Sequence, residues 1–329
     1  MAIKKRKKQR KAQIYFLSSL MFLTFLTIVL LFTTRITERD KHELIKTRVL
    51  ALDNFLTDFE RDAERAINIA GFRALIAMEQ FVSTNGSYYE DAEVIFIDVF
   101  YTGTINNTLQ PVMNQSSFLN YLQRVNQLAN NLNIDINAVV EEVKIRHTTP
   151  WDINVEVFLD VNITDSSGIA NFSFKKSYNS TFSIISLKDP MYTVNTSGKV
   201  INTIERTEFT ILVKENNTKN LSEHHTESWY LNTSRAPSYI DRFEPGFQPS
   251  PNGIESLVYL PTLSAQSLDV NLTTSIVDWQ YFGKRWNENM TVCNVKGMPE
   301  HFRIDNTTEA IDLYQLTNLE ANYTLCEIN

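Results

Sequence analysis

The sequence contains one side-chain cluster that could bind a divalent metal. His224 and His225 are adjacent, with Glu223 and Glu227 on either side, and imidazole and carboxylate groups are common metal ligands. Adjacent side chains point in different directions on a helix or a strand, so such a pair rarely converges on one ion. We therefore expect His224 and His225 to lie in a solvated loop, and we expect no metal and no cofactor.

Familiar catalytic motifs are absent from the sequence. It lacks G-x-S-x-G, H-E-x-x-H, the P-loop pattern and G-x-G-x-x-G, and with them the usual signatures of hydrolases, metalloproteases and nucleotide-binding enzymes. It also lacks Asp-x-Asp, a metal-binding pattern common in glycosyltransferases. The two carboxylates of a glycosidase need only the right separation in space, so the sequence leaves an extracellular hydrolase open. The balance favours a protein that is not an enzyme.

The chain has two cysteines, Cys293 and Cys326, and both lie near its C-terminal end. In an oxidising compartment we expect them to form a disulfide. Closing a loop of about 34 residues would stabilise the C-terminal segment by about 3–4 kcal/mol in the chain-entropy model. Two unrelated buried thiols are the alternative. A zinc site is not expected, because neither cysteine has a second ligand at the spacing of a zinc motif.

Asparagines in N-glycosylation sequons are unusually frequent. Fourteen of the 31 asparagines stand in Asn-x-Ser/Thr, whereas chance would give about five in a chain of this composition. They predict a glycosylated surface outside the cytoplasm; the alternative is incidental matches in an Asn- and Thr-rich surface. The sequon asparagines are Asn85, Asn106, Asn114, Asn162, Asn171, Asn179, Asn195, Asn216, Asn220, Asn232, Asn271, Asn289, Asn306 and Asn322.

An apolar segment near the N-terminus predicts a membrane anchor. Residues 14–32 are nineteen residues without a charge, and a helix of this length is about 30 Å long, which matches the hydrocarbon core of a bilayer. Seven basic residues lie within residues 4–11, and basic residues beside a span stay cytoplasmic. We therefore expect a single-pass protein of the cell membrane with its N-terminus in the cytoplasm. A cleavable secretory signal is the alternative, but residues 33–36 lack the small residues of its cleavage site.

The charge balance argues against nucleic acid as a partner. The chain of 329 residues carries a net charge of −7, and the residues after 11 hold 24 basic against 38 acidic side chains. Such a surface repels a phosphate backbone. With 43% hydrophobic residues, the chain is long enough for one large or two ordinary domains. The partners that we expect are membrane lipid and neighbouring protein subunits.

The residues directly before the apolar segment, Arg10-Lys11-Ala12-Gln13, resemble the class III signal of archaeal pilins and pilin-like proteins. In that family a dedicated peptidase cuts between a small residue and a following Gln, and the apolar helix remains on the mature protein. The resemblance implies cleavage between Ala12 and Gln13, and an uncleaved signal anchor is the alternative. At the fifth position after the cut, where the family commonly has a Glu associated with filament assembly, this chain has Leu17.

A stalk helix is expected to follow the anchor. Residues 35–48 are mostly charged and contain neither Gly nor Pro, so the helix can continue outward to a stop at Asn85-Gly86. From residue 49 an apolar seam recurs at spacings of three and four, as on one face of a helix. The seam is expected to pack on the protein's own sheet or, alternatively, on a coiled-coil partner or neighbouring subunits. Its members are Val49, Leu52, Leu56, Phe59, Ala63, Ala66 and Ala70.

The remaining sequence predicts an α+β fold. An amphipathic helix is expected at residues 118–132, and strands are expected at residues 94–101 and in alternating segments. The economical arrangement is a long N-terminal transmembrane and stalk helix packed on an antiparallel sheet, as in a pilin, with a smaller C-terminal α+β module. The alternating segments are residues 155–163, 169–174 and 182–187, with a hairpin turn at residues 165–168.

The expected organisation has five parts. They are a cytoplasmic basic leader at residues 1–12, a transmembrane helix at 13–32, a stalk helix at 33–82, an α+β sheet domain at 83–222 and a C-terminal module with the disulfide at 223–329.

Several short phrases resemble a group of uncharacterised archaeal membrane-anchored proteins with pilin-like N-termini. The resemblance covers most of the chain and implies location and architecture, but it implies no activity. The phrases are Phe59-Glu60-Arg61-Asp62, Glu64-Arg65-Ala66 and Gly71-Phe72-Arg73-Ala74 on the stalk, then Asp189-Pro190-Met191-Tyr192 and Gly253-Ile254-Glu255-Ser256.

Three functions are compatible with the sequence. The favoured one is a structural or interaction protein of the cell surface, either a pilin-like subunit or an adhesin on a stalk. The second is an extracytoplasmic module that binds glycans or small ligands through the aromatic residues of the C-terminal region. The third is an extracellular hydrolase.

Overall fold

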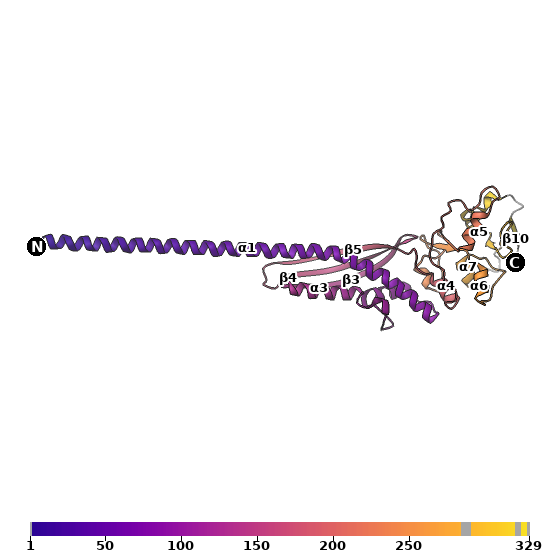
Figure 1. The fold of residues 1–329 in the computed structure, drawn as a ribbon, viewed down its shortest axis with the longest axis horizontal. Helices are drawn as coiled ribbons and strands as arrows, with labels where there is room; N and C mark the ends of the chain where they lie inside the picture. The colour runs from indigo at the N-terminus through magenta and orange to yellow at the C-terminus, as the bar shows by residue number, and fades with distance from the viewer. Residues whose placement is uncertain (1, 284–290, 320–323, 328–329) are drawn as a thin grey trace.

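The protein is an elongated α+β molecule with its N-terminus at one end (Figure 1). The computed structural model describes residues 2–283, 291–319 and 324–327. Within these ranges, the side chains of residues 2–13, 36, 37, 40 and 324–327 are not described.

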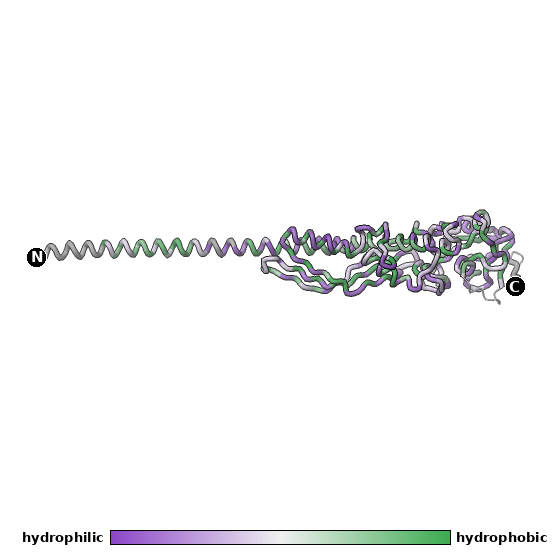
Figure 2. Tube along the Cα trace, turned by 90° about the horizontal axis from the view of Figure 1, so that it is seen from below, coloured by the Kyte–Doolittle hydropathy of each residue, from purple (hydrophilic) through white to green (hydrophobic). Residues whose placement is uncertain are grey.

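Helix α1 (Ala2–Asn85) runs unbroken for 84 residues, or about 126 Å at 1.5 Å per residue. It contains no proline, the residue that most often breaks or kinks a helix. It ends at the expected position, where Gly86 has a φ of +64° that glycine adopts without strain. Its N-terminal half projects alone, and its C-terminal half lies against the rest of the protein (Figure 1). The apolar stretch is visible on the projecting half in Figure 2.

A three-stranded antiparallel sheet lies under the C-terminal half of α1. Its order is β3 (Ile134–Thr149), β4 (Asp152–Asp165) and β5 (Asn171–Ser183), so that β4 is central. Alternate residues of β4, from Ile153 to Ile163, are fully buried on the face that α1 covers. Helix α3 (Phe118–Asn131), which confirms the expected amphipathic helix, contacts β3. The expected turn also forms, because Gly168 N–H donates to the carbonyl of Asp165.

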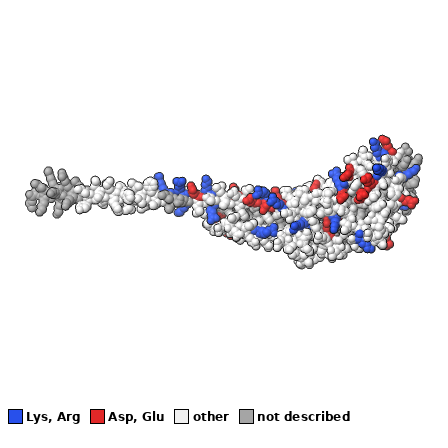
Figure 3. All heavy atoms as spheres, in the orientation of Figure 1, with Lys and Arg blue, Asp and Glu red and all other residues white. Residues whose placement is uncertain are grey.

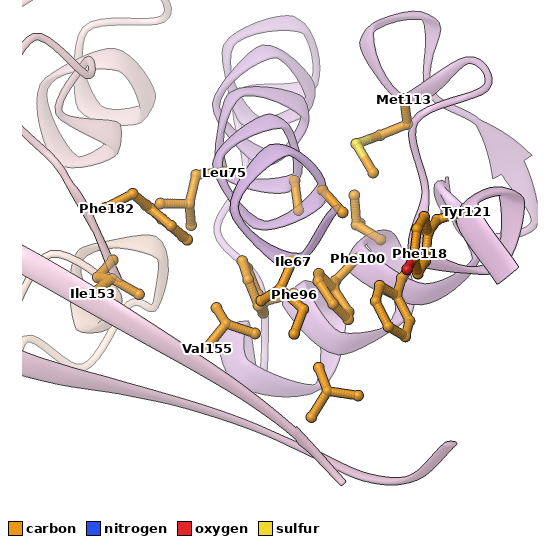
Figure 4. Close-up of a cluster of buried hydrophobic side chains, with 14 of the residues drawn as sticks. Ile67, Leu75, Phe96, Phe100, Met113, Phe118, Tyr121, Ile153, Val155 and Phe182 are labelled. Carbon is orange, nitrogen blue, oxygen red and sulfur yellow. The ribbon is translucent and has the colours of Figure 1, made fainter. Parts of the chain in front are cut away.

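The seam of α1 faces the protein's own sheet rather than solvent. Leu52, Phe59, Ala63 and Ala70 are buried, Leu56 and Ala66 are partly buried against the same core, and Val49 is exposed. The ring of Phe59 lies 6.4 Å from that of Tyr121 on α3 and 6.1 Å from that of Tyr178 on β5. We call this set of buried side chains on α1–α3 and β3–β5 the sheet core (Figure 4).

Close approach of α1 to the sheet depends on a glycine. A Cβ at Gly71 would lie 2.7 Å from Cε1 of Phe182 on β5 and 3.4 Å from Val155 on β4. Any other residue would therefore force the ring of Phe182 or the helix to shift. This contact explains why a glycine stands in the interior of a long helix.

The strand expected at residues 94–101 is wrong, because this segment is helix α2 (Ala92–Thr102). Asp91 caps it by accepting a hydrogen bond from Val94 N–H, and Gly103 ends it in the left-handed conformation. Phe96, Val99 and Phe100 share one buried face. Apart from Glu93 and Asp98 the segment is largely apolar, and it is rich in β-branched residues, so periodicity alone does not separate helix from strand.

Two other expectations about strands are corrected. Strand β3 was not expected; its alternation changes phase at an irregularity between Val140 and Glu142, where one residue is left out of the register with β4. The segment at 182–187 is not a separate strand, because β5 ends at Ser183 and the chain then turns. Ile184 and Leu187 are nevertheless buried.

A second core lies at the end of the molecule opposite the N-terminus (Figure 1). It consists of buried side chains between Tyr192 and Leu319, and we call it the distal core. Ile204, Tyr230, Tyr239, Phe243 and Ile254 lie in the same part of the sequence but pack with the sheet core. Helix α5 crosses the boundary expected at residue 223. The elements in this part of the molecule are α4 (Pro190–Asn195), α5 (Lys219–Thr226), β6 (Tyr230–Asn232), β7 (Ile254–Ser256), α6 (Leu260–Ala265), α7 (Asp278–Phe282), β8 (Val292–Val295), β9 (Ile304–Asp305), α8 (Thr308–Leu313) and β10 (Thr324–Glu327).

The short elements complete the fold. Strands β6 and β7 pair with each other, and β10, β8 and β9 form a second antiparallel sheet. The small hairpin β1 (Thr104–Ile105) and β2 (Thr108–Leu109) follows α2, and 3-10 helices lie at Pro111–Met113, Asp241–Phe243 and Leu316–Asn318.

Replacing Phe59 by Ala should lower the free energy of unfolding by about 3–5 kcal/mol, because a fully packed aromatic side chain would leave a cavity between α1, α3 and β5. Ile69→Ala on the same helix is the control, because Ile69 is 46% exposed and should cost less than about 1 kcal/mol. Chemical denaturation of the full chain in detergent would measure both changes. Equal losses in the two variants would contradict this packing of α1.

Candidate functional sites around the distal core

Arg242 is the centre of a fully buried ion cluster. Its Nη1 donates to Oδ2 of Asp189 at 2.6 Å and to Oδ2 of Asp278 at 2.9 Å, and all three side chains have no exposed surface. Its Nη2 donates to the carbonyl oxygen of Ile254 on β7. Asp189 also accepts from Tyr230 Oη at 2.7 Å. One arginine thus joins segments before α4, on β7 and on α7.

Within this cluster, the pKa of the Asp278 carboxyl group is raised. Burial raises the pKa of Asp278, although the positive charge of Arg242 and hydrogen bonds from Arg242 and Ser256 counteract the shift. The second carboxylate, Asp189, raises it further by repulsion. Two carboxylates share one cation here, and buried charge of this kind persists only where every partner is in place.

Arg235 forms a second cluster, again of one arginine with two carboxylates, here Glu255 and Asp305. Its Nε and Nη2 donate to the two oxygens of Glu255 at 2.9 and 2.6 Å, which is a bidentate pair. Its Nη1 donates to Asp305 at 2.7 Å on β9. Glu255 also accepts from Tyr314 Oη at 2.9 Å and from the indole Nε1 of Trp279 at 3.0 Å.

Trp279 connects the two arginine clusters. Its backbone N–H donates to Asp278 at 2.7 Å, while its indole reaches Glu255 in the other cluster. Ser256, next to Glu255 on β7, donates its N–H and its hydroxyl to Asp278, both at 2.9 Å. The two clusters therefore fix the position of one large aromatic ring at the edge of the distal core.

Gly253 permits the chain to enter β7. A Cβ at this position would lie 2.1 Å from the carbonyl oxygen of Ala236 and 2.4 Å from that of Thr233. These contacts are with backbone atoms, which cannot move aside as a flexible side chain would. A glycine is required here for the residues after it, Ile254 to Ser256, to meet the arginines.

An aromatic pocket lies beside Trp279. Its volume is about 350 Å³, at the small end of the usual range for ligand pockets, roughly 300–1,000 Å³. None of the described residues that line it carries a charge. The rings of Tyr88 and Phe247 lie 5.6 Å apart in an edge-to-face arrangement. The lining residues are Tyr88, Asn195, Pro245, Gly246, Phe247, Trp279, Phe282 and Gly283.

The expectation of a solvated histidine loop is wrong. His224 and His225 lie on α5 and are fully buried. The ring of His225 lies 5.4 Å from that of His301 and 5.3 Å from that of Phe302. Leu221 is buried on the same helix, and the spacing of Leu221, His224 and His225 is that of one helix face, which could have indicated burial.

Burial keeps these histidines neutral. It lowers the pKa of His224 to about 3, with repulsion from His225 as a smaller cause. It lowers the pKa of His225 to about 4, again with a smaller contribution from the charge of a neighbouring histidine, His301. Neither ring nitrogen of His224 has a hydrogen-bond partner among the described residues. Within the described ranges, no group of three or more His, Cys, Asp or Glu side chains could hold a metal ion.

Glu79 is a buried carboxyl group where α1 meets the following loops. Burial raises its pKa to about 7, although hydrogen bonds from Tyr239 and Lys188 favour its charged form. Tyr239 Oη donates to Oε1 at 2.7 Å and the Lys188 backbone N–H donates at 3.0 Å. Because the folded pKa lies above the ordinary value, this group costs stability as pH rises from about 4.5 to 7.

The chain matches no known family model, and neither a curated protein nor a solved structure is significantly similar to it.

The sequon asparagines lie at the surface. Of the twelve that fall within the described residues, none is buried. Asn216 and Asn220 are half-buried, and the other ten are exposed. Asn162, Asn171 and Asn179 are on the face of the sheet that α1 does not cover, since their strand partners alternate with the buried residues of β4. Asn289 and Asn322 lie outside the described residues.

The backbone places the two cysteines opposite each other. Strands β8 and β10 pair so that Cys326 faces Cys293 in the antiparallel register. Cys293 is buried, and the side chain of Cys326 lies outside the described residues. The register therefore supports the expected disulfide, which stays a prediction here.

Residues Ile14–Arg35 form one helical stretch long and apolar enough to cross a membrane, with a mean hydropathy of 2.3 and none of it buried in the protein. Among the described side chains of α1, Figure 3 shows none that is charged along the apolar stretch before its last residue, Arg35. The side chains of Ala12 and Gln13, the expected cleavage site, lie outside the described residues, although both belong to α1.

Sequence reasoning missed both arginine clusters, although two of the quoted phrases contain their members. Asp189-Pro190-Met191-Tyr192 supplies one of the two carboxylates that pair with Arg242. Gly253-Ile254-Glu255-Ser256 supplies the carboxylate of Glu255 to Arg235 and the carbonyl oxygen of Ile254 to Arg242. An acidic residue within an apolar phrase is a signal of buried charge. Neither phrase indicates which arginine is the partner.

Replacing Arg242 by Met should lower the free energy of unfolding by about 3–5 kcal/mol, because Asp189 and Asp278 would be left buried without a cation. Arg61→Ala is the matched control: Arg61 pairs with Asp58 on the exposed side of α1, and its loss should change stability by less than about 1 kcal/mol. Thermal unfolding of both variants beside the wild type would measure the difference. A wild-type-like Arg242→Met protein would show that the cluster is not formed.

Acidification should destabilise the distal core. Between about pH 6.5 and 4 the unfolded chain takes up protons on His224 and His225 that the folded chain excludes, which costs about 1.4 kcal/mol per pH unit for each histidine. His224→Leu should reduce this slope by the share of one histidine. His42→Leu, at an exposed position on α1, should leave the slope unchanged. The measurement is the free energy of unfolding of each variant minus that of the wild type at each pH. Glu79 changes stability with pH in the opposite direction, but it is present in every protein, so its contribution cancels in this difference. A slope unaffected by His224→Leu would contradict its burial.

Proposed function

We propose that the chain is a single-pass membrane protein of the cell surface that displays its distal core at the end of a rod. It has a structural or interaction role, as a pilin-like subunit or an adhesin, and it is not an enzyme. The N-terminus lies in the cytoplasm, and the residues after the apolar stretch lie outside.

The observation that carries this proposal is the exposure of the apolar part of α1. Its large hydrophobic side chains are exposed in the isolated chain, among them Phe22 at 67% and Phe32 at 65%. An apolar surface of this size is unstable in water and requires lipid or protein around it. The same helix continues without interruption into the sheet core, so the membrane segment is also part of the folded body.

The orientation follows from charge and from the sequons. The seven basic residues within 4–11 favour a cytoplasmic N-terminus. The exposed sequon asparagines lie on the other side of the apolar stretch, where glycans would be added. Glycans on Asn162, Asn171 and Asn179 would cover the open face of the sheet and keep other proteins from packing on it.

If α1 takes part in self-association, it does so through the part that lies nearer to the membrane than the seam. The sheet of the same chain already occupies the seam. Leu44, Ile45 and Leu50 are 56%, 43% and 51% exposed on the part of α1 between the apolar stretch and the sheet. We assign contacts with a second copy or another pilin-like subunit to this part of α1 and to the apolar stretch.

Protease added to sealed cells should digest the body of the protein and leave a short membrane-protected fragment that ends shortly after residue 35. An N-terminal epitope tag should remain intact in the same experiment, because the orientation places it inside. The fragments would be measured by immunoblotting and mass spectrometry.

Two results would contradict the proposal. A body that stays intact until the cells are lysed would reverse the orientation. A mature chain that begins after residue 35 would show that the apolar stretch is a cleaved secretory signal. A cytoplasmic marker protein, intact throughout, is the control for sealed cells.

A further inference from the structure

We propose that the aromatic pocket holds a neutral sugar attached to the protein's own Asn195. This inference rests on the proposed function, because N-glycosylation requires that the body lie outside the cytoplasm. It makes the sugar at Asn195 an internal part of the fold, unlike the sugars at the other exposed sequons.

Among the twelve sequon asparagines within the described residues, Asn195 alone lines the pocket. It is the last residue of α4, and its side chain is exposed while the residues before it, Met191 to Thr193, are buried. The side chain therefore lies at the mouth of the pocket, with its amide available to a transferase. Asn-Thr-Ser at positions 195–197 is a complete sequon.

The hydrogen bonds of Asn195 are compatible with the modification. Its Nδ2 donates to the carbonyl oxygen of Met191 at 2.8 Å and to the hydroxyl of Tyr88. Transfer from a lipid-linked sugar phosphate breaks the bond between the anomeric carbon and the phosphate oxygen and forms the bond from that carbon to Nδ2. Nδ2 loses one proton to solvent and keeps the other, which can still donate to Met191. The Tyr88 hydroxyl is then free to bond a sugar hydroxyl.

The walls of the pocket suit a sugar ring. Tyr88, Phe247, Trp279 and Phe282 present aromatic surface, and the negative face of an aromatic ring attracts the polarised C–H groups of a pyranose. The described lining side chains are uncharged, which fits a neutral sugar better than an acidic one. A volume of about 350 Å³ accommodates a monosaccharide or a disaccharide rather than a long chain.

Attachment makes the protein's own sugar the favoured occupant over a free glycan. A tethered ligand has an effective concentration of about millimolar, set by the length of its link. Weak stacking is therefore sufficient to fill the pocket. A binding site for free glycans, the second function that the sequence left open, would instead have to compete with this sugar.

The test compares two sugars on one protein by periodate oxidation, which cleaves vicinal diols that solvent can reach. In the folded wild type, the sugar at Asn195 should be oxidised about tenfold more slowly than the sugar at Asn171, which stands on the open face of the sheet. Quantitative mass spectrometry of the two glycopeptides gives both rates. Unfolding the protein first should make the rates equal.

Two variants locate the protection. Phe282→Ala opens one wall of the pocket and should bring the oxidation rate at Asn195 close to that at Asn171. Ser197→Gly removes the Asn195 sequon. Glycine suits the left-handed conformation of residue 197, φ +53°, so the substitution itself should not strain the backbone. The expected decrease in melting temperature then reports the loss of the sugar. Ser173→Ala, which removes the Asn171 sequon at an exposed position, is the matched control and should leave the melting temperature unchanged.

Each result decides between the alternatives. Equal oxidation of the two sugars in the folded wild type overturns the proposal. So does an unmodified Asn195 on a protein whose other sequons carry sugar, and binding of free glycan by that protein would assign the pocket to an external ligand. If no sequon carries sugar, the extracytoplasmic placement fails together with this inference, and the protease experiment distinguishes that case.

Discussion

The packing of residues 52–82 of α1 on strands β4 and β5 is the constraint on which the rest of the molecule depends. The same continuous helix carries the apolar stretch, and no proline interrupts it, so the direction of the body follows the direction of the apolar stretch. The contact is narrow, since it uses small residues such as Ala63, Ala70 and Gly71. Small side chains let the helix axis approach the sheet closely, and the larger rings of Phe59 and Phe182 then fill the edges.

Buried polar contacts continue this arrangement toward the distal core. Glu79 on α1 meets Tyr239, and three residues later in the chain Arg242 meets Asp189 and Asp278. Buried charges contribute little net stability compared with apolar packing, but a missing partner is costly. They therefore favour one arrangement of the connecting segments over others. The aromatic pocket lies at the edge of this polar region, and Trp279 belongs to both.

Periodicity predicted the elements whose pattern is long and regular, and it failed where local patterns are ambiguous. The seam of α1, the amphipathic α3 and the central strand β4 follow from spacing alone. Strand β3 was missed because an irregularity at residue 141 shifts its alternation. The pattern of α2 predicts a strand as readily as a helix, because the segment is short, largely apolar and rich in β-branched residues. The histidine pair predicts a solvated loop because adjacent side chains point in different directions, yet tertiary packing buries both rings on α5.

The sequence by itself determined one apolar stretch able to span a bilayer, a charged helix beyond it, an α+β body and a surface rich in sequons, because charge, hydropathy and local spacing are properties of neighbouring residues. Only the tertiary structure decided that the seam belongs to the chain's own sheet, that Arg235 and Arg242 each hold two carboxylates, and that Asn195 stands at an aromatic pocket. These contacts join residues that are far apart in the chain, such as Glu79 and Tyr239 or Arg235 and Asp305. Many such pairings are compatible with the same local pattern, and the shape of the packed core selects one of them.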